Sequence, residues 1–561
     1  MLLDANALPQ DARLHADICI VGAGAAGIAM ALTLAGSGLD VIVLEAGGQE
    51  PEPRTQALYE GTVEDAALHS PLDRYRQRQL GGSTTIWGGR CMPLDPIDFE
   101  ARPYIVGSGW PIGPEDLAPY YPAANAWCEA GDYAYTIDEA FAGPRKPMLE
   151  GFVETHFSTH TLERFSCPTD FGGRYLQRLR TATDLRVILH ANVTRLEMDE
   201  SGEAIRHVEA RALDGKAFTV AAGSVVLAAG GLEVVRLLLN SPGRTGRGVG
   251  NAHDVVGRYY MCHLAGTIGN IVLAPPRRAW HGYDVADDGT YCRRRLALRA
   301  EVQREQGIGN FVARLHHPRI TDPAHGTAIL SLLFLARAFV PYEYARRLHG
   351  DERVTVGAWL RHGLNVLRGV PSVAGFLWHW LRERTLAARK FPSIIVYPRS
   401  QRYSLDFHAE QEPNPESRVT LGTSVDELGM RRLHVDWRYT RQDVATVQKS
   451  LALLAADIRD SGIGEFDYDP GEVEREMTRY GAYGGHHIGT ARMGDDPRTS
   501  VVDRNCRVHE VRNLYVAGAA VFPTSSQANP TLTLVALALR LARHLQARHA
   551  GGEPADPGSP A

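Results

Sequence analysis

The first ordered stretch of the chain alternates between strand and helix patterns. Apolar residues run over 17–21 and again over 41–44, and a glycine turn and an apolar helical period over about 25–37 lie between them. A short continuous apolar run is typical of a strand buried on both faces, and two such strands joined by a helix form the βαβ unit of a parallel sheet. The pattern therefore predicts a nucleotide-binding half at the start of the chain.

A second group of strand patterns begins near residue 186. Apolar runs occur over 187–189, 205–210, 218–221 and 224–228, and the turn pair Asp-Gly at 214–215 separates the second run from the third. Runs that a tight turn joins in this way are typical of a hairpin. We therefore expect a short antiparallel excursion inserted between parallel strands.

The rest of the chain divides into a long mixed region and a shorter last block. Region 261–483 combines strand patterns at 393–397 and 404–409 with amphipathic helical stretches, and the last block has a strand over 514–517 and a long helix starting at 530. Together these patterns predict a mixed α/β fold, in which a Rossmann-like domain is joined to a substrate domain of antiparallel sheet and helices.

Composition narrows the class of protein. The 561 residues are 44% hydrophobic and 22% charged, which is ordinary for a globular chain and excludes a disordered or fibrous one. The net charge of −5 gives no reason to expect nucleic acid or an anionic membrane as a partner. No apolar run approaches the roughly 20 residues of a membrane span, so we expect no integral span.

Cysteine use and the ends of the chain suggest the compartment. The seven cysteines form no CxxC pair, so we expect free thiols, no metal site and a reducing compartment. The first residues show no signal-peptide pattern, which favours a cytoplasmic location. Residues 550–561 have the composition of a disordered tail.

One stretch, 357–381, is unusually rich in aromatic residues. It contains Trp359, Phe376, Trp378 and Trp380. A partner or membrane-surface patch is one interpretation, and core packing or a subunit contact is favoured over it.

The glycine turn after the first strand matches GxGxxG. Its glycines are Gly22, Gly24 and Gly27, and Glu45 follows at the end of the next strand. In this setting the first glycine permits the turn, the second lets the backbone approach a pyrophosphate, and the carboxylate accepts hydrogen bonds from ribose. The motif predicts a dinucleotide but does not distinguish FAD from NAD.

Segments near the C-terminus carry a family resemblance. They are 486–494 (HHIGTARMG), 518–524 (GAAVFPT) and 529–533 (NPTLT). With the glycine turn, the glycine-rich loop 81–89, the segment SGWPIGPEDLAPYY and residues 229–241, they resemble the glucose-methanol-choline (GMC) family of FAD-dependent alcohol oxidoreductases. Within that family the pyranose oxidase and sugar dehydrogenase branch is the most similar. The resemblance covers the FAD-binding half well and much of 261–483 only loosely.

The resemblance implies how the chain divides. An FAD-binding domain would comprise 1–99, 186–260 and 484–549, and a substrate-binding domain would comprise 100–185 and 261–483. The residues that it implies for FAD are Gly22, Gly24, Ala25, Ala26, Gly27, Glu45, Ala46, Gly81, Gly82, Ser83, Thr85, Ile86, Trp87, Gly88, Val193, Ala229, Gly230, Gly518, Ala519, Asn529, Pro530 and Thr531.

Two of these positions depart from the family pattern. Ile86 stands where covalent members have a histidine bonded to the flavin, so non-covalent FAD is expected. Gly518 stands where many members have an aspartate, so a carboxylate contact near the ribityl chain is not expected.

The resemblance also implies the catalytic pair. His486 holds the position of the base that takes the alcohol proton while hydride passes to flavin N5, and imidazole suits this role because it titrates near neutral pH. Asn529 holds the position of the residue that hydrogen-bonds the substrate oxygen, and His487 is the alternative base. Because Asn favours the N-cap and Pro favours the first helical turn, we expect the last helix to begin at Asn529 and to point its positive end at the flavin.

The implied substrate is a sugar, glycoside or polyol, with oxygen, a quinone or a redox protein as electron acceptor. The candidates for binding its hydroxyls are His487, Tyr397, Gln411, His316 and His317. A hydroxynitrile-lyase-like enzyme, an oxidase of a non-sugar alcohol and a noncatalytic flavin subunit stay open. An NADPH-dependent monooxygenase is disfavoured because no second dinucleotide motif follows Gly27. The sugar, the oxidised carbon, the choice between oxidase and dehydrogenase, and homo-oligomer formation also stay open.

Overall fold

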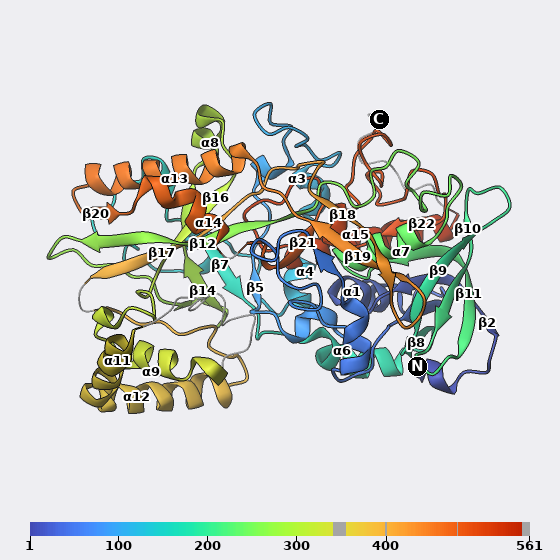
Figure 1. Cartoon of the computed structure of the whole chain (residues 1–561), viewed down its shortest axis with the longest axis horizontal. Helices are drawn as coiled ribbons and strands as arrows, with labels where there is room; N and C mark the ends of the chain where they lie inside the picture. The colour runs from blue at the N-terminus through green and yellow to red at the C-terminus, as the bar shows by residue number, and fades with distance from the viewer. Residues whose placement is uncertain (340–354, 399–400, 480, 552–561) are drawn as a thin grey trace.

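Two sheets organise the protein. A computed structural model describes residues 1–339, 355–398, 401–479 and 481–551, so the predicted tail 550–561 lies outside the described residues from position 552 onward. Figure 1 shows one sheet with its helices at the right of the molecule and the second sheet at the left. Below the second sheet in this view lies a group of three helices, α9 (Ala328–Leu335), α11 (Val356–Arg368) and α12 (Val370–Trp380).

The first sheet is largely parallel. In spatial order its strands are β1 (Leu2–Asp4), β8 (Leu185–Leu189), β3 (Val41–Leu44), β2 (Ala12–Val21), β11 (Ala217–Leu227), β10 (Ile205–Arg211) and β9 (Asn192–Met198), with β22 (Leu514–Val516) paired to β11. The pairings from β1 to β11 and that of β22 are parallel, whereas β10 pairs antiparallel with β11 and with β9. The predicted parallel sheet with an antiparallel excursion is confirmed.

One boundary prediction inside this sheet is wrong. The predicted strands 218–221 and 224–228 are a single strand, β11, which pairs with β2 from Phe218 to Leu227. Gly223, which separated the two predicted strands, does not interrupt β11, because the neighbouring strand β2 continues alongside. Strand β9 had no predicted counterpart.

Helices cover the first sheet and position its glycine turn. They are α1 (Ala25–Leu34), α6 (Phe171–Thr181), α7 (Gly231–Asn240) and α15 (Thr531–His549). Helix α1 packs against α15 and begins directly after the turn at Gly22 and Gly24. A Cβ added to Gly27 would lie 2.0 Å from the carbonyl oxygen of Gly22, so this glycine lets the helix approach the turn closely.

The second sheet is antiparallel. In spatial order its strands are β20 (Gly464–Asp467), β12 (Met261–Leu273), β17 (Arg402–Ala409), β16 (Phe311–His316), β15 (Leu296–Leu298) and β6 (Phe157–Ser158), and β21 (Tyr483–Ile488) pairs with β12. Helices α8 (Ala300–Gln306), α13 (Arg441–Asp460) and α14 (Val473–Thr478) belong to the same part of the chain. The predicted antiparallel substrate half is confirmed in its fold class.

The predicted strand 393–397 is wrong. These residues have irregular backbone, and Ser393 and Ile394 line a cavity, as Ile395 and Tyr397 line a smaller one beside it. Their apolar character thus reflects cavity walls and not pairing in a sheet.

Smaller elements join the two units. Four strands, β13 (Asp284–Val285), β14 (Tyr291–Arg294), β7 (Leu162–Phe165) and β5 (Arg90–Cys91), form one small sheet, and β18 (Arg418–Val425), β19 (Arg431–Asp436) and β4 (Thr62–Val63) form another. Short helices are α2 (Pro53–Gln56), α3 (Pro114–Leu117), α4 (Tyr121–Trp127) and α5 (Ile137–Ala140). Because α4 packs against α15 and α6 against α1, parts of segment 100–185 contact the first unit, and the predicted domain limits stay a prediction.

The aromatic-rich stretch is two helices and not one. Helix α11 ends before Gly369, and α12 begins at Val370 with a proline in its first turn. Core packing does not describe it, since α12 has no buried residue and the Trp378 side chain is 67% exposed. Within the described ranges, no helix combines the length and apolar character that crossing a membrane requires.

The close contact at Gly27 gives a first test. We expect Gly27→Ala to destabilise the flavin-free protein by roughly 1–3 kcal/mol, because the added methyl group meets a backbone oxygen that cannot move away cheaply. Chemical denaturation measures this change. The matched control is Gly143→Ala, where an added Cβ has no atom within 4 Å, and equal unfolding of both variants would contradict the packing role.

Candidate active site

A cavity of 720 Å³ extends from the glycine turn after β2 to the second sheet. At one end it is lined by the turn and the start of α1, and at the other by residues of β16 and β17, including His316 and His408. The start of α15 and both histidines of β21 lie along it. The cavity therefore joins the predicted dinucleotide site to the predicted substrate half.

The glycine end can accept a pyrophosphate. Gly22 has φ of +104°, and a Cβ on Gly24 would have no atom within 4 Å, so the backbone there is open to a ligand. Helix α1 begins next to this turn and directs its N-terminal N–H groups and dipole toward it. Glu45 accepts hydrogen bonds from the N–H groups of Ala23 (2.8 Å) and Gly47 (3.0 Å), while its burial raises the pKa of the carboxyl.

Most of the predicted FAD residues line this cavity. They are Gly22, Gly24, Ala25, Ala26, Glu45, Ala46, Gly82, Ser83, Ile86, Trp87, Gly88, Val193, Ala229, Gly230, Gly518, Ala519, Asn529, Pro530 and Thr531. The catalytic candidates His486 and His487 line it too, as do His316 and His317.

Five predicted residues do not line the cavity. Gly27 and Gly81 serve close packing, since a Cβ on Gly81 would lie 2.7 Å from the backbone nitrogen of Gly172. Thr85 donates its hydroxyl proton to the carbonyl of Gly82. These three residues pack against, or bond to, residues next to the cavity and do not face a ligand themselves.

The other two are the candidates for substrate contact. The Gln411 side chain accepts from the backbone N–H of Cys262 and the indole N–H of Trp437, and it donates to the carbonyl of Arg438. All its polar groups are thus used inside the fold. Tyr397 lines the smaller neighbouring cavity of 200 Å³ and is 47% exposed.

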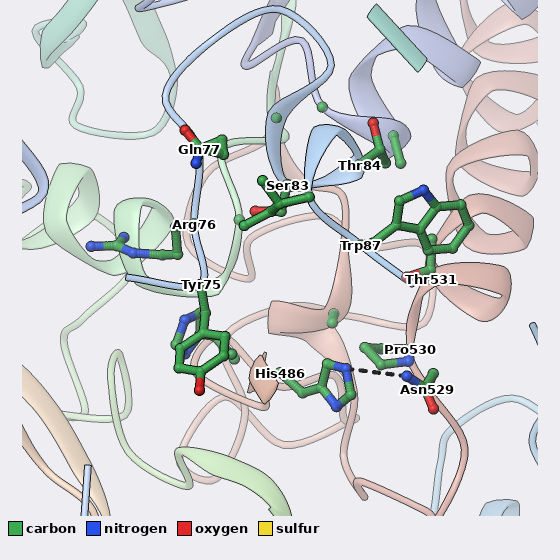
Figure 2. Close-up of a pocket in the computed structure, with 18 of the residues that line it drawn as sticks. Tyr75, Arg76, Gln77, Ser83, Thr84, Trp87, His486, Asn529, Pro530 and Thr531 are labelled. Atoms are coloured by element: carbon green, nitrogen blue, oxygen red, sulfur yellow. Dashed lines mark hydrogen bonds between the residues drawn. The ribbon is translucent and has the colours of Figure 1, made fainter. Parts of the chain in front are cut away.

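Pairing of β21 with β12 brings together residues far apart in sequence. Figure 2 shows the side chains of His486 and Asn529 pointing toward each other where they line the cavity, with Nδ2 of Asn529 3.3 Å from Nε2 of His486. On the other side of the ring, Nδ1 of His486 lies 2.7 Å from Nδ1 of His263 on β12. Nε2 of His263 in turn lies 3.2 Å from the carbonyl oxygen of Ser525.

This chain of hydrogen bonds determines where the protons lie. The carbonyl of Ser525 can only accept, so His263 carries its proton on Nε2 and offers a lone pair at Nδ1. His486 must then donate from Nδ1, which leaves the lone pair of its Nε2 facing Asn529 and the cavity. The fold therefore presents Nε2 of His486 as a proton acceptor.

Burial keeps both rings neutral. Burial lowers the pKa of His486 well below its ordinary value of 6.5, and the nearby His263 and Arg90 lower it further. Burial likewise lowers the pKa of His263 to about 4. A neutral imidazole at this position is free to take a proton from a ligand.

A second hydrogen-bond chain prepares His487 in the same way. Nδ1 of His69 donates to the carbonyl of Ser70, so its Nε2 accepts from the hydroxyl of Tyr260 at 2.8 Å. The oxygen of Tyr260 then accepts from Nδ1 of His487 at 2.7 Å. Nε2 of His487 is buried with no hydrogen-bond partner, which leaves an acceptor for a ligand in the cavity.

The predicted N-cap of the last helix, Asn529, is wrong by one residue. Helix α15 begins at Thr531 with Pro530 as its N-cap, and no side chain caps it. Asn529 instead directs its amide toward His486, and its Oδ1 is buried without a partner. The contact of Nδ2 with the imidazole competes with capping, and the amide oxygen Oδ1 is left for a ligand.

Several cavity residues were not predicted. Arg76 and Arg78 line the cavity and pair with Glu233 at 3.2 and 3.1 Å. Burial raises the pKa of Glu233, but the charges of Arg236, Arg78 and Arg76 outweigh it and bring that pKa to about 2. These residues lie in a polar loop and a helix without a short motif, so only the folded chain shows that they meet.

Comparison with known proteins agrees with this geometry. Residues 413–538 match the family model described as GMC oxidoreductase, and residues 16–260 match that of pyridine nucleotide-disulphide oxidoreductase. Paromamine 6'-oxidase of Streptomyces fradiae is 24% identical over 94% of this chain and 90% of that protein. The fructose dehydrogenase large subunit of Gluconobacter japonicus is 25% identical over 94% and 97%. The solved structure of pyridoxine 4-oxidase from Mesorbium loti shares the fold, with a TM-score of 0.55 and 20% identity over 95% and 99%.

The protein is a flavin-dependent oxidoreductase. More particularly, residues 413–538 form a GMC oxidoreductase domain, and the homologues of the chain include oxidases and dehydrogenases that act on CH–OH groups. The cavity fits that cofactor because the glycine turn is open to a pyrophosphate and because buried polar atoms of His487 and Asn529 lack partners within the protein.

The hydrogen-bond chain at His486 can be tested directly. We expect ¹⁵N NMR of the imidazoles to show His486 as the Nδ1–H tautomer at neutral pH, with the ring still neutral when the pH falls to 6.5, because burial lowers its pKa. The spectrum of His486→Gln assigns the signal. An Nε2–H tautomer, or a protonation midpoint above 6.5, would contradict the deduced arrangement.

Proposed function

We propose that the protein oxidises a CH–OH group of a sugar, glycoside or polyol, with His486 as the base. The observation that carries this proposal is a neutral imidazole whose Nε2 lone pair faces the cavity and accepts there from the amide Nδ2 of Asn529, a bond that a substrate hydroxyl can replace. When bound, FAD supplies the two-electron acceptor of the reaction. Paromamine 6'-oxidase and fructose dehydrogenase, by their names, act on carbohydrate hydroxyls, which supports this substrate class.

The residues around the base handle one proton. Nε2 of His486 accepts the hydroxyl proton, and the imidazolium that forms keeps its Nδ1–H bond to the lone pair of His263. The amide N–H of Asn529 donates to the substrate oxygen and holds it beside Nε2. Burial and the charge of Arg90 disfavour this imidazolium, so His486 returns to its neutral form by releasing the proton to solvent.

The cofactor would be held by the residues that line the rest of the cavity. The glycine turn and the N-terminus of α1 hold the diphosphate, and Glu45 accepts from ribose hydroxyls. Ile86 lines the cavity with an apolar side chain that has no nucleophile, which supports non-covalent attachment. Thr531 places the positive end of α15 at the cavity, where it favours negative charge on a bound ligand.

The charge of the cavity narrows the substrate class. Among the described lining residues, Arg90, Arg293 and Arg384 line it toward the second sheet, and Arg90 lies 3.5 Å from the carboxylate of Glu163, which does not line the cavity. The acidic residues that do line it, Glu45 and Glu233, are held by backbone N–H groups and by arginines. The nearby guanidinium of Arg90 lowers the pKa of His486 and would repel a cation there. We therefore favour a neutral or acidic carbohydrate over a polycationic aminoglycoside.

The compartment and the acceptor belong to the same proposal. All seven cysteines are free thiols, which supports a reducing compartment such as the cytoplasm. Oxygen, a quinone or a redox protein would reoxidise the flavin.

Anaerobic titration of the flavin tests the proposed reaction. We expect neutral sugars, glycosides or polyols to bleach the yellow flavin, and His486→Ala to retain FAD but to be reduced about 10²-fold more slowly or worse, because a positioned base contributes that much. The comparison variant is His487→Ala, for which we expect the smaller loss. Flavin that stays oxidised with every alcohol while a hydroxynitrile is cleaved would instead indicate a lyase.

The role of His263 gives a separate kinetic test. His263→Leu removes the acceptor for the Nδ1–H of His486, so we expect flavin reduction about 10-fold to 100-fold slower with little change in KM. His263→Gln keeps both contacts, since its amide oxygen can accept from His486 and its amide nitrogen can donate to Ser525. Rescue by glutamine supports a positioning role, and equal rates in both variants would contradict it.

A further inference from the structure

Helix α11 turns its apolar face to solvent. Leu360 and Leu367 are 66% and 72% exposed, and Val356 and Leu364 lie on the same face at helical spacing and are exposed as well. The opposite face holds His362, which is buried against α9. Its Nδ1 is hydrogen-bonded to the hydroxyl of Ser331 at 3.0 Å. A helix on a water-facing surface normally has the reverse orientation.

Helix α12 shares this property. Between 370 and 380 it has no charged residue, and none of its residues is buried. Val370, Leu377 and Trp378 are more than half exposed, while Trp380 turns inward and lines the active-site cavity. The two neighbouring helices thus expose apolar side chains along one continuous segment, as a surface that binds a partner does.

The charges around these helices are mostly positive. From 356 to 390 the chain has six basic residues and one acidic residue, a net charge of +5 in a protein whose total is −5. The basic residues are Arg361, Arg368, Arg382, Arg384, Arg389 and Lys390. Arg361, Arg368, Arg382 and Lys390 are exposed, whereas Arg384 and Arg389 donate to backbone carbonyls.

We propose that α11 and α12 form a docking surface for a lipid bilayer that contains anionic lipids. Outward leucines and tryptophan with arginines beside them are the composition of helices that lie in the membrane interface, with apolar side chains among the acyl chains and cations at the headgroups. The bilayer surface supplies both the apolar cover and the negative charge that this segment requires. The helices lie in the plane of the membrane and do not cross it.

A second copy of the chain is a poorer cover. A two-fold contact through this surface sets the same patch against itself, which would place the exposed basic residues of one copy opposite those of the other. Attraction between the apolar side chains would then be opposed by repulsion between the arginines. An anionic surface has no such conflict.

The surface lies at one end of the molecule and shares a wall with the cavity. In Figure 1 the helices form a separate group away from the first sheet. Trp380 and Arg384 line the cavity that contains His486, while Trp378, two residues earlier, faces outward. Docking therefore brings one wall of the cavity next to the membrane, while His486 and Asn529 make no contact with the lipid.

Vesicle co-sedimentation of the flavin-loaded full chain tests this proposal. We expect binding to phosphatidylcholine vesicles that contain phosphatidylglycerol, weaker binding to phosphatidylcholine alone, and release by salt. The triple variant Leu360→Ser, Leu367→Ser, Trp378→Ser should bind about 10-fold more weakly or worse, and Arg361→Gln with Arg368→Gln should reduce the preference for phosphatidylglycerol. The matched control is Val106→Ser, which changes a 76% exposed apolar residue elsewhere on the surface.

The outcomes separate the alternatives. Because the altered side chains are exposed, we expect the flavin content and the unfolding midpoint of the variants to be unchanged. These two measurements check that the variants fold. Absence of vesicle binding by the wild type, or equal binding by wild type and triple variant, overturns the proposal. A concentration-dependent dimer that the triple variant abolishes, without vesicle binding, would assign the surface to a second copy instead. None of these results depends on which alcohol is oxidised.

Discussion

The antiparallel pairing of β21 with β12 is the constraint on which the site depends. It joins the second sheet to the segment that returns the chain to the first sheet, and it places His263 beside His486 across 223 residues of sequence. Since His263 is itself held by the carbonyl of Ser525, the proton positions follow from the fold. The tautomer of the proposed base, His486, thus follows from a backbone register before any ligand is bound.

The same pairing explains why the cavity is chemically divided. Toward β2 it is bounded by backbone turns, which suit a phosphate-containing cofactor, and toward β16 and β17 by imidazoles and arginines, which suit a hydroxylated substrate. His486 and Asn529 stand between these two parts. Two sheets of different construction are therefore needed for one reaction.

Local signals in the sequence predicted the local parts of this arrangement. The turn at Gly22 and Gly24 and strands β2 and β3 follow from neighbouring residues, so both were predictable. The partner of His486 was not, because strand pairing over a long separation leaves no motif. Capping preference also failed at Asn529, since a tertiary contact with the imidazole competes for the same amide.

Averages over the chain concealed a further feature. A total charge of −5 gave no reason to expect an anionic partner, although the segment 356–390 alone has a charge of +5. Its apolar residues have helical period, which a sequence pattern equates with a buried face. Only the folded chain shows that the face points outward, because the packing against α9 uses the other side of α11.

The most direct test of the central claim is a crystal structure of the flavin-loaded enzyme with a bound, unreactive alcohol analogue. The account predicts that the ligand hydroxyl lies within hydrogen-bond distance of both Nε2 of His486 and the amide of Asn529, while Nδ1 of His486 still contacts His263. A ligand hydroxyl held by His487 instead, or by neither histidine, would contradict it.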